Sequence, residues 1–521
     1  MQGKKHHQPK LFTTFQLADR VPLNSFYRRL KDILDLQFLY KETRKYYGKC
    51  GQKSLDPIVF FKLCLVGYLE NIISDRKLIE HCSMRLDILY FLDYDIDEEL
   101  PWHSTVSRTR QLFPEEVFES VFERVFTMCV DKGMVSGHTQ AIDSAPVKAN
   151  ASMDSLELKV PEEELEEYLR KVRYMSSPDR TRKAKHNKAS LSQQSITASD
   201  SELKEIKSRN KKWSEAQDQR VGSNNKGSKY TSNKTHYSPT DPDARISIKP
   251  GKARKLNYQS QLAVDTAHHV ISYIGADFAD LKDNQSLQSV VNKLKPRLQN
   301  HGLIWGNVLA DTAYSSGENY AFLERENIKS YIPPHGTYKG GPDGFTYHEG
   351  GNYYVCTNNK RLLFKGAKRN VKGLLDDHYA TVRKDCVDCV FAAGCKGKSF
   401  EKRIRVTHFR AEYERAIARV KSKRGSIMKG KRQSTVEPVF GTLTQFMGMR
   451  KVNTLGIKQA NKVMLLAAVA YNIKKYLKFT RKLTTTMSKE AKLAALYIND
   501  QIRAILKSFK QSKILIPMFK P

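Results

Sequence analysis

Two aspartates and one glutamate are the residues of this chain whose types and surroundings best fit a chemical role. Asp143 lies in HTQAIDSAPVKANAS and Asp311 in VLADTAYSSGENY, and each is expected at the end of an apolar, strand-like run. Glu437 lies in STVEPVFGTLTQF and is expected at the start of an amphipathic helix. Carboxylates are the hard oxygen ligands that Mg²⁺ prefers, and a pair of divalent ions suits chemistry on a phosphodiester. The three residues therefore predict a metal site that acts on a phosphodiester.

Each of these residues also has a purely structural explanation. Aspartate is common in turns, so Asp143 and Asp311 could simply end their strands. Ser434 and Glu437 have the spacing of a capping box, in which the glutamate would serve only the helix terminus. The catalytic interpretation therefore depends on all three residues occurring together, in strand, strand and helix contexts.

The net charge of the chain indicates which phosphodiester is involved. The 521 residues include 89 Lys and Arg against 55 Asp and Glu, which gives a formal net charge of +34. Such a field attracts polyanions, so DNA is the expected partner, ahead of a ribosomal site or an anionic membrane surface. The N-terminal residues lack an apolar core segment and are not expected to form a signal peptide, and the longest apolar stretch, residues 463–473, is expected to be too short to cross a bilayer. A cytoplasmic, nucleoid-associated protein with no membrane contact is expected.

The first part of the chain is expected to contain a helical domain and the beginning of a sheet. Residues 1–137 have apolar residues at helical spacing, which fits a helix-turn-helix DNA-binding domain or an ordinary helical bundle. Residues 138–330 have the order strand, hairpin, helix, strand and helix, which is compatible with an RNase H-like mixed sheet. Within them, residues 176–240 are rich in Lys, Ser and Asn and are expected to be disordered or ordered only by DNA.

The rest of the chain is expected to interrupt this sheet domain and then complete it. Residues 331–424 have short strand-like runs among Gly-rich turns and read as an insertion domain. Residues 425–478 contain the Glu437 helix and a buried helix, and residues 479–521 form a basic tail. The expected fold class is α+β, with an RNase H-like mixed-sheet catalytic domain, a helical N-terminal DNA-binding domain and a β-rich, Cys-containing insertion.

The cysteines of the insertion indicate a second kind of metal site. Cys386, Cys389 and Cys395 form a C-x2-C-x5-C run, and Cys356 precedes them in a strand-like segment. Four thiolates would hold a structural Zn²⁺ tetrahedrally, and reduced thiols without a metal are the alternative. The remaining cysteines lie mostly in apolar helical runs and read as core residues: Cys50, Cys64, Cys82 and Cys129.

Taken in order, several segments resemble the DDE transposases of bacterial insertion sequences. They are LDPIVFFKLCLVGYL, PWHSTVSR, AIDSAPVKANAS, TDPDARISIKPGK, NYQSQLAVDTAHHVI, VLADTAYSSGEN and STVEPVFGTL, and they extend over residues 11–476. Within the insertion-sequence-four superfamily, the chain is most similar to the family numbered eleven-eighty-two. The resemblance implies that Asp143, Asp311 and Glu437 bind Mg²⁺, for which Mn²⁺ can substitute. It also implies cleavage of DNA at the element ends and strand transfer by the exposed 3′-hydroxyl. The cysteine pattern is similar in relatives and supports the zinc site.

The resemblance also implies residues that touch DNA. The family has an arginine a few residues before the glutamate and a lysine seven residues after it. Arg432 matches the arginine, Lys431 is equally close, and Thr444 stands where the lysine is expected. The predicted DNA contacts are Arg432, Lys431, Arg108, Arg110 and Lys148.

The TDPDAR segment matches the family as well. Asp241, Asp243 and Arg245 are expected either to orient the insertion or touch DNA, or to form a simple turn. His103 also has two explanations: it could contact DNA, or it could simply begin a helix.

Three functions compete at this point. The first is a transposase that acts as a dimer on two element ends and a target DNA. The second is a catalytically decayed or repurposed transposase that remains a sequence-specific DNA-binding protein, an alternative favoured by Thr444. The third is an RNase H-like nuclease without strand transfer.

Overall fold

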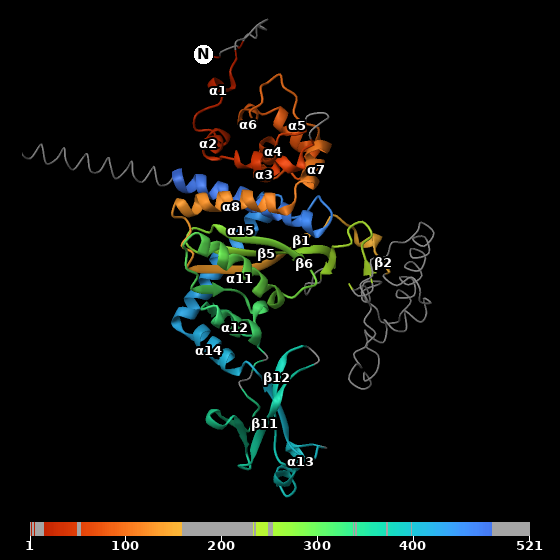
Figure 1. Ribbon diagram of the computed structural model, residues 1–521, viewed down its shortest axis with the longest axis vertical. Helices are drawn as coiled ribbons and strands as arrows, with labels where there is room; N and C mark the ends of the chain where they lie inside the picture. The colour runs from red at the N-terminus through yellow and green to blue at the C-terminus, as the bar shows by residue number, and fades with distance from the viewer. Residues whose placement is uncertain are drawn as a thin grey trace, which may run out of the picture.

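The computed structural model describes residues 15–48, 54–158, 236–247, 254–336, 341–370, 373–397 and 399–481, with a few single residues between them. Helices from the N-terminal part lie at one end, a mixed sheet with its helices lies in the middle, and a β-rich module lies at the other end (Figure 1). Most of the 176–240 insertion, the basic tail beyond residue 481 and Cys50 fall outside the described residues.

The N-terminal part is helical, as predicted. Most side chains of the helix at Pro57–Leu69 are buried. This helix begins with Asp56 as N-cap, whose carboxylate accepts from the amides of Ile58 and Val59, and with Pro57 at the first helical position. Aromatic side chains such as Phe60 and Phe113 form the core between the helices. The helices are α1 (Leu17–Arg20), α2 (Phe26–Ile33), α3 (Phe38–Thr43), η1 (Arg44–Tyr46), α4 (Pro57–Leu69), α5 (Asp75–Ser83), α6 (Leu86–Leu92), α7 (His103–Leu112) and α8 (Glu115–Asp131).

The central sheet is mixed. Strand β5 runs antiparallel to β1, β4 and β6, whereas β7 runs parallel to β1 and to β8. The path β6-β5-β1-β7-β8 therefore places β1, which carries Asp143, at the centre of the sheet. The strands are β1 (Thr139–Lys148), β4 (Arg245–Ser247), β5 (Lys255–Asp265), β6 (Ile271–Phe278), β7 (Asn307–Leu309) and β8 (Lys329–Tyr331). A separate short pair joins β2 (Glu157–Leu158) to β3 (His236–Tyr237).

Helices pack on this sheet and bury its apolar side chains. Helix α11 contacts β5 and β6, α12 contacts β8, and α15 contacts β1, β5, β7 and β8. The apolar helix at residues 457–481 is largely buried and follows α15 in the chain. The bounds are η2 (Met153–Ser155), α11 (Asp283–Asn300), η3 (Thr312–Tyr314), α12 (Gly317–Arg325), α14 (Arg410–Lys421) and α15 (Lys423–Phe446).

The insertion forms its own antiparallel sheet at the far end of the molecule (Figure 1). Its strand order is β13-β12-β11-β10-β9, and a small core of Tyr354, Leu362, Tyr379 and Ile404 holds it together. The sequence predicted the other strands, but β12 contains Asp376 and Asp377 and was missed. The elements are β9 (Phe345–His348), η4 (Glu349–Gly351), β10 (Tyr353–Cys356), β11 (Arg361–Arg369), β12 (Leu375–Ala380), η5 (Arg383–Cys386), α13 (Ala392–Cys395) and β13 (Arg403–Thr407).

Two local expectations for the carboxylates were wrong. Asp143 lies in the middle of β1, not at its end, because pairing with β5 continues as far as Lys148. Glu437 lies deep inside α15, whose N-cap is Ser422, so Ser434 and Glu437 form no capping box. The Gly- and Lys-rich run before Glu437 belongs to the same helix, which packs on the sheet.

Within the described residues, no helix combines the length and apolar character needed to cross a membrane.

Candidate functional site

The first two predicted carboxylates are brought to the same position on adjacent parallel strands. Leu309 on β7 pairs with Ala141 on β1, and Asp311 and Asp143 each follow two residues later. Strand β7 ends at Leu309, and Asp311 caps the short η3 helix by accepting from the amide of Ala313 at 2.9 Å. The carboxylate of Asp143 accepts from the amide of Ser144 at 2.8 Å. Parallel strand pairing therefore places the two aspartates side by side.

Helix α15 supplies the third carboxylate and a cation. Arg432 Nη1 lies 2.9 Å from Asp143 Oδ2, and Arg432 Nη2 lies 4.0 Å from Glu437 Oε1. The Arg432 side chain is 15% exposed, whereas the Glu437 side chain is 63% exposed. The guanidinium therefore links the strand carboxylate to the helix carboxylate, and Glu437 remains accessible to a ligand.

The environment of the two aspartates disfavours their charged forms. Burial, which is the largest cause, and the neighbouring charge of Asp311 together raise the pKa of Asp143 to about 6, against the opposing effects of the Ser144 amide and Arg432. Burial also raises the pKa of Asp311, with a further contribution from Asp283. Desolvated carboxylates that repel one another gain from a bound cation.

A fourth carboxylate, which the sequence did not reveal, lies beside this pair. Asp283 opens α11, and its Oδ1 accepts from Ser144 Oγ at 2.6 Å. Gln259 on β5 donates to the same Ser144 hydroxyl at 2.6 Å. In the sequence, Asp283 is indistinguishable from an ordinary acidic residue in the first turn of a helix, so only the fold connects it with Asp143.

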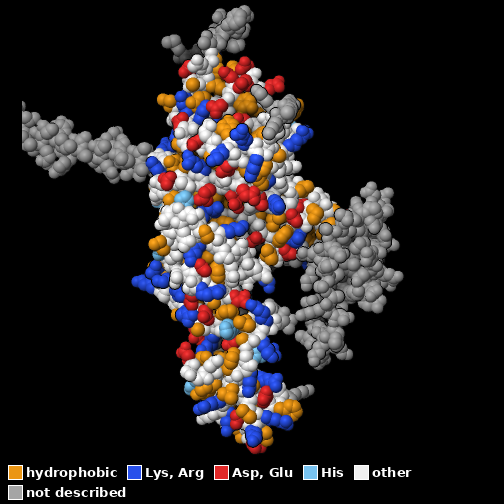
Figure 2. All heavy atoms as spheres, in the orientation of Figure 1, with side chains coloured by type: hydrophobic (Ala, Val, Ile, Leu, Met, Phe, Trp, Pro, Cys, Tyr) orange, Lys and Arg blue, Asp and Glu red, His pale blue; other side chains and the backbone are white. Residues whose placement is uncertain are grey.

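The predicted DNA-contact residues are in different environments. Lys431 and Arg108 are exposed, and the Lys148 side chain is exposed at the end of β1. The backbone of Lys148 pairs with a later segment: its amide donates to Arg450 O and its carbonyl accepts from the amide of Val452. Lys and Arg side chains are spread over the visible face of the molecule and do not form one compact patch (Figure 2).

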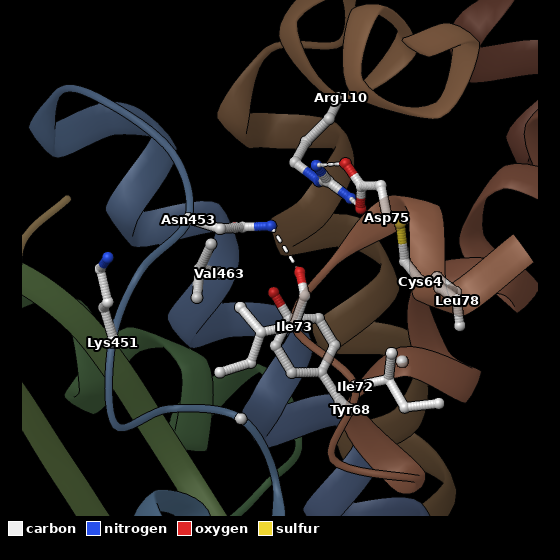
Figure 3. Close-up of a pocket in the computed structure, with 12 residues that line it drawn as sticks. Cys64, Tyr68, Ile72, Ile73, Asp75, Leu78, Arg110, Lys451, Asn453 and Val463 are labelled. Atoms are coloured by element: carbon white, nitrogen blue, oxygen red, sulfur yellow. Dashed lines mark hydrogen bonds and ion pairs between the residues drawn. The ribbon is translucent and has the colours of Figure 1, made fainter. Parts of the chain in front are cut away.

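Arg110 has a different role from the one predicted. Its guanidinium forms two hydrogen bonds with the carboxylate of Asp75, at 2.7 and 2.8 Å, and the residue is only 7% exposed. Its carbonyl accepts from Lys462 Nζ at 3.0 Å. Figure 3 shows this ion pair at a pocket where the N-terminal helices meet the segment after α15, and Asn453 crosses the junction to Ile73 O. Arg110 is therefore a buried structural residue, and the prediction that it contacts DNA was wrong.

The TDPDAR segment anchors the last described helix. Asp241 is fully buried and accepts from Tyr258 OH and from the amide of Gly456, and Asp243 accepts from the amide of Ile457. These contacts favour the structural explanation of the two aspartates. Thr444 is half-buried, and its hydroxyl donates to Phe440 O within α15.

All four cysteines of the insertion line one cavity. Cys356 comes from the end of β10, Cys386 from η5, Cys389 from the following loop and Cys395 from α13. Two side chains contact their sulfurs: Asn358 Nδ2 lies 3.4 Å from Cys389 Sγ, and Thr381 Oγ1 lies 3.1 Å from Cys386 Sγ. Segments about 40 residues apart in sequence thus bring their thiols to one place.

The donor chemistry at the two sites fits the predicted metals. Carboxylate oxygens suit Mg²⁺ or Mn²⁺, and four thiols suit Zn²⁺. Among the described residues, however, no three Asp, Glu, His or Cys side chains already stand at mutual metal-binding distance. Closing either site therefore requires side-chain movement, most of all by the exposed Glu437.

Two family models match the chain. Residues 15–112 match the Transposase domain (DUF772), and residues 355–477 match the Transposase DDE domain. The second match contains Glu437 and all four cysteines of the insertion, and both matches lie outside Asp143 and Asp311. No curated protein matches the chain.

Solved structures give weaker likenesses. One is a piggyBac transposase synaptic complex with hairpin DNA, at 9% identity and a TM-score of 0.29, covering 84% of this chain and 70% of that one. Another is a Mos1 transposase paired-end complex with the left transposon end, at 10% identity and a TM-score of 0.15, covering 60% and 73%. At these TM-scores the likenesses define neither a fold nor a function. The two domain matches support a DDE-type DNA transposase of insertion sequences.

Proposed function

We propose that this chain is a DNA transposase of the insertion-sequence family numbered eleven-eighty-two, which cleaves at terminal inverted repeats and joins the freed 3′-hydroxyl to target DNA. The observation that carries the proposal is the equivalent placement of Asp143 within β1 and Asp311 just beyond the end of the parallel strand β7, with Glu437 of α15 linked to Asp143 through Arg432. The strand path β6-β5-β1-β7-β8, with three antiparallel and then two parallel strands, supports an RNase H-like catalytic domain.

Asp143, Asp311 and Glu437 are the residues that would hold two Mg²⁺ ions. When bound, such ions lower the pKa of an attacking hydroxyl and neutralise the leaving 3′-oxygen. Arg432 keeps the Asp143 carboxylate in place through its 2.9 Å ion pair and holds a positive charge next to the position for the scissile phosphate. Arg432 links the strand carboxylate to the helix carboxylate, and binding of the ions would still require movement of the exposed Glu437 side chain.

DNA binding is proposed for the helical N-terminal domain and for the exposed cations Arg108, Lys148 and Lys431, together with Arg432. Phosphate contacts of this kind are independent of sequence, so affinity is expected to fall steeply with salt. Two element ends must be held together for strand transfer, which implies a dimer on DNA.

A structural Zn²⁺ is proposed for the cysteine cavity. Cys356, Cys386, Cys389 and Cys395 would bind it as thiolates and tie η5 and α13 to the insertion sheet. Its role would be to stabilise the insertion, since the cavity lies outside the central sheet and the carboxylates.

The experiment that tests the proposal combines binding and joining. Wild type and Asp143→Ala are incubated with a labelled element-end duplex, a target plasmid and Mg²⁺. The proposal expects joined products with wild type only, and equal end binding by both proteins. Cleavage without joining would indicate a nuclease, and binding without cleavage by wild type would indicate a repurposed DNA-binding protein.

A further inference from the structure

The two consecutive residues Asp143 and Ser144 connect opposite faces of the sheet. Successive side chains of a strand point to opposite faces, so Asp143 faces α15 while Ser144 faces α11. The contacts agree: Asp143 pairs with Arg432 of α15, and Ser144 Oγ bonds Asp283 of α11. A substitution on the face that α11 covers can therefore affect the Asp143 carboxylate on the face that α15 covers.

The hydrogen bonds at Ser144 form a continuous chain. Its hydroxyl accepts from Gln259 Nε2 at 2.6 Å and donates its one proton to Asp283 Oδ1 at 2.6 Å. Its amide donates to Asp143 Oδ1 at 2.8 Å. Asp283 thereby fixes Ser144, and the Ser144 amide fixes the orientation of the Asp143 carboxylate.

The position of Ser144 makes this support necessary. Strand β7 pairs with β1 only from Thr139 to Ala141, so the β1 backbone at Ser144 has lost that neighbouring strand. On this stretch β5 remains the paired strand, and the Asp283 and Gln259 contacts hold the Ser144 side chain.

We propose that Asp283 is a positioning residue of the carboxylate site, which orients Asp143 through Ser144. The inference rests on the proposed function, because it assumes that Asp143 and Asp311 bind metal. Groups of this kind, which hold a ligand without touching the metal, commonly change metal affinity by about 10- to 100-fold when removed.

The test measures Mn²⁺ binding by electron paramagnetic resonance, with the full chain and without DNA. Asp283→Ala removes the charge and the hydrogen bond, whereas Asp283→Asn keeps an oxygen that can accept from Ser144. Asp280→Asn is the matched control, because it removes an exposed carboxylate of the same loop whose nearest partner is Arg245 at 3.8 Å. Thermal melting and end binding in EDTA check that each variant is folded.

The expected result is a loss of Mn²⁺ affinity of about tenfold for Asp283→Ala. Asp283→Asn should fall between Asp283→Ala and wild type, and Asp280→Asn should match wild type. Should Asp283→Ala fail to fold, Asp283→Asn and Ser144→Ala decide the matter by the same measurement. Variants at Asp283 that bind Mn²⁺ like wild type, while Asp311→Ala does not, would overturn the inference alone. Wild type that binds no Mn²⁺ would overturn this inference and the proposed metal site together.

Discussion

Arg432 joins Asp143 of the central strand to Glu437 of the helix, with its Nη1 at 2.9 Å from the first carboxylate and its Nη2 at 4.0 Å from the second. Five residues are about 1.4 helical turns, which separates Arg432 and Glu437 by about 140° around α15. Their charges come within 4.0 Å because both side chains are long and reach toward each other. The cation and the two carboxylates therefore form one unit.

Replacement of Arg432 by alanine should lower cleavage strongly. The variant loses the group that holds Asp143 and the positive charge beside the phosphate position, a loss expected to cost about 100-fold in rate. Single-turnover cleavage of a labelled element end measures the effect. Arg432→Lys should recover only part of the rate, because lysine cannot bridge two groups as a planar guanidinium can. Wild-type rates for Arg432→Ala would show that this residue has no part in the reaction.

Stabilisation by Mg²⁺ should depend on pH. Burial raises the pKa of Asp143 from 3.8 to about 6, so in the metal-free protein its contribution to stability is present below 3.8 and is lost as the pH rises through about 6. Over the same range the carboxylate becomes free of its proton and able to bind a cation. The Mg²⁺-induced rise in melting temperature should therefore be larger at pH 7.5 than at pH 5. An equal rise at both values, or an unchanged rise in Asp143→Asn, would contradict this.

Alanine variants of Arg108 and Arg110 should have different effects, because Arg108 is exposed and Arg110 is buried in an ion pair. Removal of one partner of a buried ion pair costs about 3 kcal/mol, so Arg110→Ala should unfold at clearly lower denaturant concentration. Arg108→Ala should leave stability unchanged and reduce the slope of log affinity against log salt by about one. Denaturation curves and a salt series with an element-end duplex measure the two effects. Unchanged stability together with a smaller salt slope for Arg110→Ala would indicate that Arg110 contacts DNA after all.

The insertion should carry one Zn²⁺ per chain. Elemental analysis of the purified protein should detect it, and Cys389→Ser should lose it, because a serine hydroxyl is a poor ligand beside three thiolates. Cys129→Ser provides the control, since Cys129 is a buried core residue of α8. Wild type that contains no Zn²⁺, or Cys389→Ser that retains it, would contradict a zinc site in this cavity.

Much of the fold follows from sequence patterns because its elements are locally encoded. The Asp56-Pro57 helix start, the β5–β6 hairpin and α11 each carry a periodic pattern and a clear boundary. The beginning of α15 does not, because Gly425 and Gly430 weaken the helical pattern and packing on the sheet compensates for it.

The site was predictable only in part for a related reason. Asp143 and Asp311 follow apolar strand patterns, so their types and positions were visible in the sequence. Asp283 reaches the site only through the packing of α11 on the sheet, and the Arg110 ion pair needs Asp75 from another helix. Contacts between distant segments leave no periodic signal.

The central claim is that Asp143, Asp311 and Glu437 act together in metal-dependent cleavage of DNA. The most direct test is cleavage of a labelled element-end duplex with Mg²⁺, using wild type beside Asp311→Ala, with Mn²⁺ as a second metal. The account predicts nicking at the element end by wild type and none by Asp311→Ala, with similar duplex binding by both. Equal cleavage by the two proteins, or binding without cleavage by wild type in either metal, would contradict it.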